Sequence, residues 1–267
     1  MALPPPSDTT IALVTGGSSG IGVTLARGLA ARGHAVCLVA RRPRELEAAA
    51  RDIAAEHDVR TEAISCDLSD AGAREALASD IDRLDLDVQV LVNAAGFGTY
   101  RRFVQAERER ELRLVRLNVE APLDLIARFL PAMVERRRGA VLNIASTAGF
   151  QPIPGNASYA ASKAFVQSHS EALHAELRGT GVTVTVVSPG PVRTGFQAEA
   201  GIEGDERLPG FLWTSVEDVA DDALRAVAEG RSCAVPGLAN QVMAAYSRYA
   251  PRALLMPTVE RTWSRLR

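Results

Sequence analysis

The stretch that decides the fold is Ile11-Ala12-Leu13-Val14-Thr15-Gly16-Gly17-Ser18-Ser19-Gly20-Ile21-Gly22. Its first five residues form an apolar run of strand length, and residues with helical spacing follow from Val23 to Ala31. Glycine permits a tight turn between them, and it lets a pyrophosphate reach the free N–H groups at the helix N-terminus. The stretch therefore predicts a strand–turn–helix unit that binds a dinucleotide, with an ordinary structural turn as the alternative.

The rest of the chain repeats this alternation of strand and helix. Short runs rich in Val, Ile and Leu occur seven times, at Ile11–Thr15, Ala35–Ala40, Arg60–Ser65, Val88–Val92, Gly139–Ala145, Val182–Ser188 and Ser232–Val235. Segments with helical spacing lie between them, among them Leu46–Glu56, Ala121–Arg137 and Ala160–Arg178. Apolar strands separated by helices predict a parallel sheet that is covered on both faces. We therefore expect an α/β fold, a single-domain, Rossmann-like, doubly wound sheet of seven parallel strands.

No linker divides this domain. Residues 1–9, which include three consecutive prolines, are expected to form a loose arm, residues 10–250 the domain and residues 251–267 a C-terminal tail. The segment 189–213 interrupts the alternation, and such a long irregular segment is usually a lid or a binding loop. A disordered insertion is the alternative. Docking over a ligand is favoured by four apolar side chains of the segment, Phe196, Phe211, Leu212 and Trp213.

Composition narrows the function classes. The 267 residues carry a formal net charge of -2, which gives no overall field to attract nucleic acid or an anionic membrane. Cys37, Cys66 and Cys233 are far apart, which argues against a disulfide framework or a zinc site and fits a reducing cytoplasm. The four histidines are scattered without carboxylates at ligand spacing, so no metal site is expected. No apolar run reaches the roughly 18 residues of a membrane-spanning helix. We therefore expect a soluble cytoplasmic protein.

The end of the second apolar run indicates which dinucleotide binds. The run ends in Ala40-Arg41-Arg42, and the next acidic residue is Glu45. NAD sites usually place a carboxylate here to hold the ribose 2′-hydroxyl, whereas a guanidinium forms charge-assisted bonds to the 2′-phosphate of NADP. Arg41 and Arg42 therefore predict NADP rather than NAD, with a solvated surface pair as the alternative. Asp67, after the third run, is a candidate acceptor for the adenine amino group, or otherwise part of a helix N-cap.

Further motifs follow the later apolar runs. Asn93-Ala94-Ala95-Gly96 follows the fourth run, Ser146 follows the fifth, and Tyr159-x-x-x-Lys163 begins 13 residues after Ser146. Ser188-Pro189-Gly190-Pro191-Val192-Arg193-Thr194 follows the sixth run. Together with the glycine-rich turn, these motifs resemble the short-chain dehydrogenase/reductase family over roughly residues 10–235. The chain departs from the family pattern at Ala94, where the family has a second asparagine.

The resemblance implies a catalytic set of Asn118, Ser146, Tyr159 and Lys163. Tyr159 and Lys163 are four residues apart and share one helix face, so the ammonium is expected to lower the pKa of the phenol from its ordinary ~10. The phenol then donates a proton to a carbonyl oxygen, or removes one in the reverse direction. Ser146 is expected to hold that oxygen. The resemblance assigns the nicotinamide ribose to Lys163, and to Asn118 a water that feeds Lys163.

The residues and the resemblance together predict a cofactor site. Its members are Gly16, Ser18, Ser19, Gly20, Ile21, Gly22, Arg41, Arg42, Asp67, Asn93, Ala95, Gly96, Tyr159, Lys163, Pro189, Gly190, Val192 and Thr194.

These observations predict an NADP(H)-dependent oxidoreductase that reduces the carbonyl of an apolar or aromatic small molecule, or runs the reverse reaction. A non-catalytic NADP-binding sensor or scaffold of the same fold is the alternative, and an isomerase or dehydratase of a nucleotide sugar is a third. Family members commonly pair through the helices predicted here at Ala121–Arg137 and Ala160–Arg178. We therefore expect a homodimer or homotetramer, with Leu125, Phe129, Phe165 and Leu173 on the outer faces of those helices.

Overall fold

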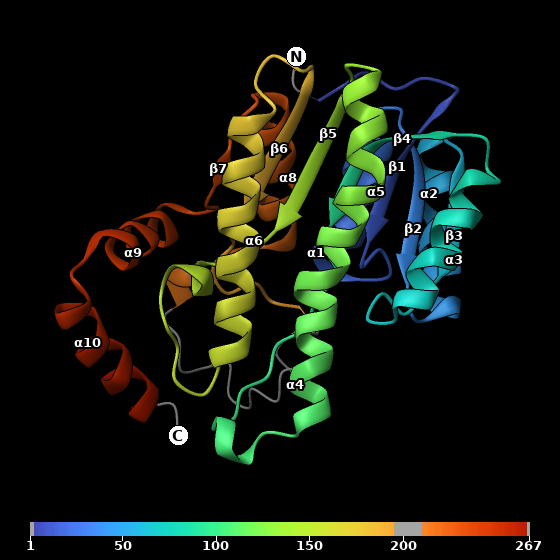
Figure 1. Cartoon of the computed structure of the whole chain (residues 1–267). Coiled ribbons are helices and arrows are strands. Elements are labelled where there is room, and N and C mark those ends of the chain that lie inside the picture. The colour runs from blue at the N-terminus through green and yellow to red at the C-terminus, as the bar shows by residue number, and fades with distance from the viewer. Residues whose placement is uncertain (1–2, 195–209, 266–267) are drawn as a thin grey trace.

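Seven strands form one sheet (Figure 1). The computed structural model describes residues 3–194 and 210–265. The strands are β1 (Thr10–Thr15), β2 (Ala35–Ala40), β3 (Thr61–Ser65), β4 (Asp87–Asn93), β5 (Gly139–Ile144), β6 (Val182–Val187) and β7 (Cys233–Ala234). Every neighbouring pair is parallel, in the order β3-β2-β1-β4-β5-β6-β7. The predicted seven-stranded, doubly wound sheet is therefore confirmed, and its direction of growth reverses between β1 and β4.

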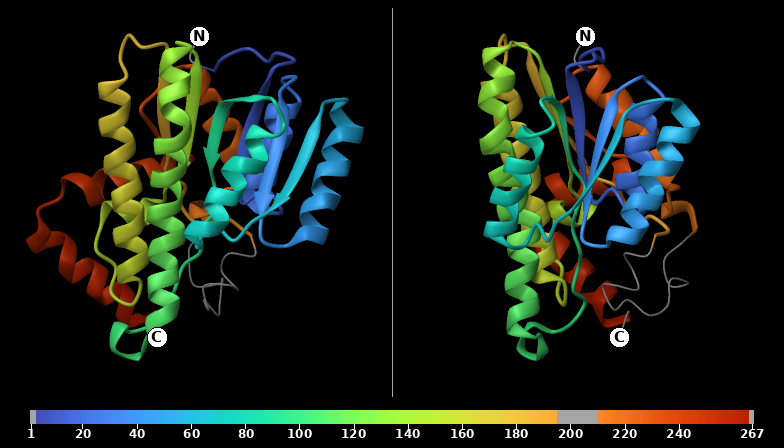
Figure 2. Two further views of the ribbon diagram at one scale, coloured as in Figure 1. Left: turned by 45° about the vertical axis from the view of Figure 1, so that its right-hand side comes forward. Right: turned by 90° about the vertical axis from the view of Figure 1, so that its right-hand side faces the viewer.

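Helices cover both faces of the sheet (Figure 2). One layer consists of α1 (Gly20–Ala30), α2 (Pro43–His57) and α8 (Val216–Ala228), and the other of α3 (Ala71–Asp82), α5 (Ala121–Glu135) and α6 (Ala157–Glu176). Successive residues of β1 alternate between the two layers: Ala12 and Val14 pack on the first, Ile11 and Leu13 on the second. Because both sides of the strand are buried, the whole run is apolar.

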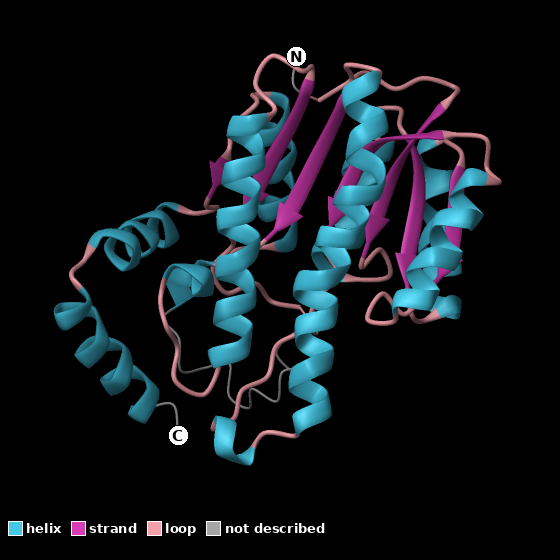
Figure 3. Cartoon of the chain, in the orientation of Figure 1, coloured by secondary structure: helices cyan, strands magenta, loops and turns pink. Residues whose placement is uncertain are grey.

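The remaining helical segments gather beyond the carboxyl ends of the strands, at the arrowheads in Figure 3. They are η1 (Phe103–Gln105), α4 (Arg108–Val115), the π-helical turn η2 (Arg116–Glu120), η3 (Thr147–Phe150), η5 (Gly210–Leu212), α9 (Leu238–Tyr249) and α10 (Arg252–Arg265). This edge is where open α/β sheets bind ligands, in the crevice at the point where the strand order reverses. The fold therefore places the segments that follow β4, β5 and β6 around one crevice.

Both ends of the chain are more ordered than the sequence suggests. Residues 3–9, expected to be a loose arm, lie against the domain: Leu3 packs on the core, Pro4 is buried, and Arg138 Nη2 donates to Pro5 O at 2.6 Å. Most of the tail expected at 251–267 is the helix α10, in which Leu255 is buried. The three prolines at the start remove backbone donors but leave carbonyls free to accept, and Arg138 uses one of them.

The segment 189–213 is described only at its two ends. Residues 195–209, with Phe196, lie outside the described residues, and so does most of the predicted lid. At the far end, Trp213 carries Arg193 over its ring, with the guanidinium carbon 5.3 Å from the ring centroid. Val192 forms an isolated parallel bridge with Thr214, which brings the two ends of the segment together.

The expected pairing surface needs correction. Leu125 is fully buried against the sheet, and Phe129 and Leu173 also pack on that core, so these three side chains face inward. Phe165 is partly exposed, as expected. Helical spacing identifies an apolar face but not what covers it, and here the sheet covers it. Oligomerisation itself stays a prediction.

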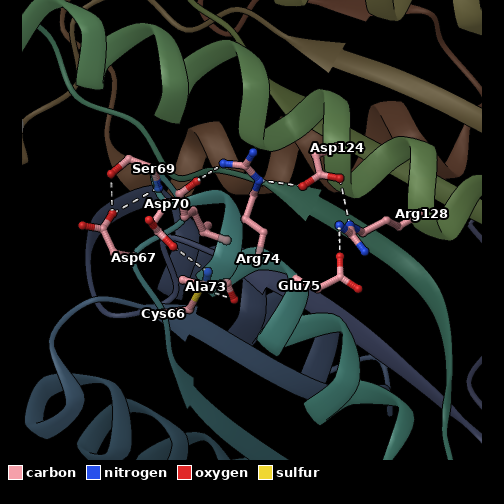
Figure 4. Close-up of polar contacts among 10 residues, drawn as sticks. Cys66, Asp67, Ser69, Asp70, Ala73, Arg74, Glu75, Asp124 and Arg128 are labelled. Carbon is pink, nitrogen blue, oxygen red and sulfur yellow. Dashed lines mark hydrogen bonds and ion pairs between the residues drawn. The ribbon is translucent and has the colours of Figure 1, made fainter.

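A buried arginine ties α3 to α5 (Figure 4). Arg74 is 5% exposed; its Nε donates to Asp124 Oδ2 at 2.6 Å, and its Nη1 donates to Leu68 O at 2.9 Å. Arg128 donates to Asp124 Oδ1 at 2.8 Å and to Glu75 Oε2 at 2.5 Å. Partial burial acts to raise the pKa of the Asp124 carboxyl, but the hydrogen bonds from the two arginines hold it below its ordinary value. The network fixes one cofactor-side loop against the helix layer.

Arg74→Met tests how much this network stabilises the fold. The substitution leaves the Leu68 carbonyl unpaired and takes one partner from Asp124, so we expect the free energy of unfolding to fall by about 2 kcal/mol. Arg128→Met is the matched control, because Arg128 is more exposed and we expect a loss below about 1 kcal/mol. Urea denaturation at neutral pH measures both variants. An equal loss in the two variants would contradict the assignment.

Candidate functional site

The glycine-rich turn packs too tightly for side chains. Gly16 has φ +70°, and a Cβ on Gly22 would lie 2.2 Å from Gly16 O, well inside contact distance. A Cβ on Gly17 would lie 3.0 Å from Cβ of Leu38, so the turn also presses against β2. The first turn of α1 holds no acidic side chain. The turn therefore presents the N-terminus of an eleven-residue helix at the crevice, a cradle suited to a pyrophosphate.

Arg42 reaches the turn. Its Nη2 donates to Ser18 Oγ at 3.5 Å and to Ser19 Oγ at 3.4 Å, and its Nη1 lies 3.6 Å from Glu45 Oε1. Arg41 is exposed and lies close enough to Asp67 to lower the pKa of that carboxyl. Arg42 therefore stands next to the phosphate cradle, whereas Arg41 lies near Asp67, the second residue after β3.

Asp67 is held by two partners (Figure 4 shows its bonds to Ser69). Its Oδ1 accepts from Ser69 N and Ser69 Oγ, and its Oδ2 accepts from Arg113 Nη2 at 2.6 Å. Burial acts to raise the pKa of this carboxyl, but Ser69 and Arg113 together lower it below the ordinary value. The N-cap of α3 is Asp70, whose carboxylate accepts from Ala73 N at 2.7 Å. The helix N-cap is therefore Asp70 and not Asp67, and the contact of Asp67 with an adenine amino group stays a prediction.

Thr15 joins the two strands at the reversal point. Its Oγ1 accepts from Ala94 N at 3.0 Å and from Ala95 N at 3.1 Å, and donates to Val92 O at 3.2 Å. Asn93 donates to Asn143 Oδ1 at 2.8 Å in the neighbouring strand β5. Thr15 was not among the residues predicted for the site. Its position as the last residue of β1, directly before the turn, is the signal that was available.

The catalytic candidates come together from three segments. Ser146 follows β5 and caps η3 by accepting from Ala148 N at 3.2 Å. Tyr159 and Lys163 lie one turn apart on α6, with Lys163 Nζ 5.7 Å from the Tyr159 ring centroid. A hydrogen bond links Ser146 to the Tyr159 phenol. The structure therefore brings the hydroxyl, the phenol and the ammonium together near the carboxyl end of β5, and their catalytic role stays a prediction.

Asn118 lies in the π-helical turn η2, not in a regular helix. Its Nδ2 donates to Phe97 O at 3.0 Å and to Ser162 Oγ at 3.1 Å, and its Oδ1 accepts from Phe97 N at 3.2 Å. A Cβ on Gly96 would lie 3.0 Å from Asn118 Oδ1 and 3.5 Å from Lys163 Nζ. The missing side chain of Gly96 therefore lets Asn118 and Lys163 border the same small space, and π-turns commonly mark such sites.

Burial dominates the protonation of the pair. It raises the pKa of the Tyr159 phenol to about 12, and the bond from Ser146 opposes this only in part. Burial also lowers the pKa of the Lys163 ammonium to about 8. The expected lowering of the tyrosine pKa by its lysine is therefore wrong here. Both groups lose their hydration, and Lys163 Nζ donates to Ile144 O at 2.9 Å rather than to the phenol.

The segment after β6 closes over the glycine-rich turn. Thr147 N donates to Pro189 O at 2.9 Å, which ties the segment to the residues after Ser146. A Cβ on Gly190 would lie 2.2 Å from Asn240 Oδ1, so this position also requires glycine. Thr194 lies close to the turn, with its Cγ2 3.4 Å from the place of a Cβ on Gly20. The segment thus spans from the catalytic candidates to the phosphate cradle.

The comparisons with known proteins agree with this geometry. A family model described as short chain dehydrogenase matches residues 10–203. The chain belongs to this family. An uncharacterized oxidoreductase of Myxococcus xanthus is 39% identical to it over 191 residues, which span 70% of this chain and 74% of that protein. The aligned parts of similar curated proteins span between 60% and 78% of their length.

Two solved structures extend the likeness. A short-chain dehydrogenase from Sphingobium yanoikuyae in complex with NADPH has 36% identity and a TM-score of 0.79, and the match covers 93% of this chain and 95% of that one. A bulky-bulky ketone specific alcohol dehydrogenase from Comamonas testosteroni has 31% identity and a TM-score of 0.76, with coverage of 94% and 95%. The protein is accordingly an oxidoreductase of this family.

Two kinds of feature are absent from the described part of the chain. Within residues 3–194 and 210–265, no cluster of three His, Cys, Asp or Glu side chains has the geometry to hold a metal ion. No helix of this part combines the length and apolar character that crossing a membrane requires.

Lys163 is the only lysine of the chain, so its titration can be measured directly. Lysine labelled with carbon-13 at Cε gives a single side-chain resonance, and we expect it to titrate near pH 8 rather than at the ordinary 10.5. The unfolded chain then binds more protons than the folded one from about pH 8 to 10.5, so this group makes stability rise with pH. Relative to Lys163→Met, the wild type should gain about 1 kcal/mol between pH 7 and pH 9. A resonance that titrates above pH 10 would contradict the burial argument.

Proposed function

We propose that the protein uses NADPH to reduce the carbonyl of a bulky apolar ketone or aldehyde to an alcohol. The observation that carries the proposal is the meeting of Ser146, Tyr159 and Lys163 at the carboxyl end of β5, next to the glycine-rich turn. Membership of an oxidoreductase family supports the reaction class. The Tyr159 phenol, whose pKa burial raises, is protonated at neutral pH, which is the form that donates a proton in reduction.

The residues present suit a nicotinamide dinucleotide phosphate. The close approach of Gly22 and Gly16 forms the cradle for the pyrophosphate, and Arg42 with Ser18 and Ser19 offers donors for a 2′-phosphate. When bound, the nicotinamide supplies the hydride for the carbonyl carbon. The solved Sphingobium yanoikuyae relative is in complex with NADPH, which supports the same choice for this chain.

The side chains handle the oxygen of the substrate. Tyr159 donates its phenolic proton to the carbonyl oxygen as that oxygen gains negative charge, and Ser146 hydrogen-bonds the same oxygen and keeps it next to the phenol. Lys163, with a pKa of about 8, is mostly protonated at neutral pH and can return a proton to Tyr159. Asn118 positions this group by holding the Phe97 backbone beside Gly96.

Two aromatic residues in the segments that follow β5 and β6 support the proposed substrate class. Phe150 follows Ser146 in η3, and Trp213 stands at the described end of the segment 189–213. The Comamonas testosteroni relative is specific for bulky-bulky ketones, which supports a substrate with apolar groups on both sides of the carbonyl.

Tyr159→Phe tests the proposed proton donor. The substitution keeps the ring and removes only the hydroxyl, so we expect kcat for ketone reduction to fall by about 100-fold or more while NADPH binding stays unchanged. Oxidation of NADPH at 340 nm measures turnover, and quenching of protein fluorescence measures cofactor affinity. Retention of more than half of the activity would exclude Tyr159 as the donor. An inactive wild type that still binds NADPH would favour a sensor over an enzyme.

Arg42→Asp tests the choice of cofactor. The variant sets a carboxylate against the 2′-phosphate, so we expect the Kd for NADPH to rise by about 10- to 100-fold, as loss of one charge-assisted bond implies. The Kd for NADH should change by less than about threefold, because NADH carries no such phosphate. Arg41→Asp measures how much Arg41 contributes to binding the 2′-phosphate. Arg51→Asp on the exposed face of α2 is the charge-matched control. Equal changes for the two cofactors would mean that Arg42 does not read the phosphate.

A further inference from the structure

The exposed apolar side chains of this protein are concentrated near its C-terminus. Twelve large apolar side chains are exposed in the described part of the chain, and seven of them lie between positions 211 and 254. They are Phe211, Leu238, Val242, Met243, Tyr246, Tyr249 and Leu254. In Figure 1, α9 and α10 stand away from the sheet on the side of β7, so this group occupies one corner of the molecule.

Four of these side chains form a stripe along α9. Leu238, Val242, Tyr246 and Tyr249 follow the helical spacing of three or four residues and share one face. Leu238 is 76% exposed and Tyr249 77% exposed, so hardly any of their surface is covered within the chain as described. We call these four residues the α9 stripe. A patch of this kind is uncommon on a soluble surface unless something docks on it.

The opposite face of α9 holds the helix in place without the stripe. Asn240 Nδ2 donates to Leu212 O and to Thr214 Oγ1, both at 3.2 Å. Ser247 Oγ donates to Gln151 Oε1 at 3.0 Å, and Arg248 forms a forked pair with Glu171 at 3.1 and 3.2 Å. Because these polar contacts anchor α9 to η3, η5 and α6, substitutions in the α9 stripe should leave the fold intact.

The charge of this region indicates what covers it. Residues 238–267 contain five arginines and one glutamate, although the whole chain has a net charge of -2. Arg252 is exposed at the start of α10, directly after the α9 stripe. Arginine forms forked bonds to phosphate groups, and basic residues beside an apolar face strengthen attachment to anionic lipid. Tyr246 and Tyr249 are amphipathic side chains of the type enriched where a membrane meets water.

We propose that the α9 stripe and the start of α10 dock on the surface of a bilayer that contains anionic phospholipid. A second copy of the chain is the competing occupant. Pairing of two such faces about a two-fold axis brings their arginine-rich segments together, and like charges oppose that contact. The docking face adjoins η3 and η5 at the edge of the site, so the crevice lies close to the bilayer surface. The proposal does not depend on the proposed function, because docking needs neither cofactor nor turnover.

Flotation of the full chain with vesicles tests the proposal. One set of vesicles is phosphatidylcholine, and the other is equal parts of phosphatidylcholine and phosphatidylglycerol. We expect the wild type to float with the mixed vesicles and much less with phosphatidylcholine alone, and to lose binding as salt is raised. The triple variant Leu238→Ser, Val242→Ser and Tyr249→Ser should lower the partition coefficient by about tenfold or more, because the apolar face that enters the interface is gone.

Matched variants separate the apolar contribution from the charge. Arg252→Glu should weaken binding only to the mixed vesicles, whereas the control variants Leu123→Ser on α5 and Arg51→Glu on α2 should bind like the wild type. Circular dichroism and light scattering of each variant report folding and particle mass. The proposal is overturned if the wild type floats with neither kind of vesicle, or if the triple variant floats to the same extent as the wild type. It is also overturned if the triple variant halves the particle mass, since the stripe is then a contact between copies.

Discussion

The hydroxyl of Thr15 connects the parts of the site to one another. It accepts from two successive backbone N–H groups, those of Ala94 and Ala95, and so fixes the chain that leaves β4 against the end of β1. This fixes the position of Gly96, where the absence of a side chain leaves room for Asn118 and Lys163. On the other side of Thr15 the glycine-rich turn begins, in which Gly22 approaches Gly16 O too closely for any other residue. The position of Thr15 therefore fixes both the glycine-rich turn and the backbone beside Asn118 and Lys163.

Burial has opposite effects on the two groups that the chemistry couples. Burial favours the neutral form of each group, so it raises the pKa of Tyr159 and lowers the pKa of Lys163. A protonated phenol is the form that reduction requires, and an ammonium with a lowered pKa releases its proton more easily than an exposed lysine does. The same desolvation that raises the tyrosine pKa therefore prepares its neighbour to replace the proton. In the proposed reaction, Ser146 hydrogen-bonds the substrate oxygen without adding a charge.

Sequence periodicity predicted the sheet well because all seven strands are buried on both faces and read as apolar runs. The motifs of the family resemblance, and not periodicity, pointed to Ser146, Tyr159 and Lys163, and the structure places these residues after β5 and on α6. Periodicity failed for Leu125 and Leu173, because a helical pattern does not say whether a sheet or a second chain covers an apolar face. The contacts of Asp67 with Arg113 and of Arg74 with Asp124 join residues about 50 positions apart, which no local pattern encodes. The predicted lowering of the Tyr159 pKa was wrong, because residue spacing reveals a neighbouring charge but not the loss of hydration.

Net charge averages over a surface that is not uniform. A value of -2 gives no overall attraction to an anionic surface, and that inference holds for the molecule as a whole at long range. Salt limits such forces to about 10 Å, however, so a docking face responds to the charges within that distance. Residues 238–267 contain five arginines and one glutamate, and the exposed α9 stripe lies in the same part of the chain. Local charge, and not the total, therefore decides what this corner of the molecule can bind.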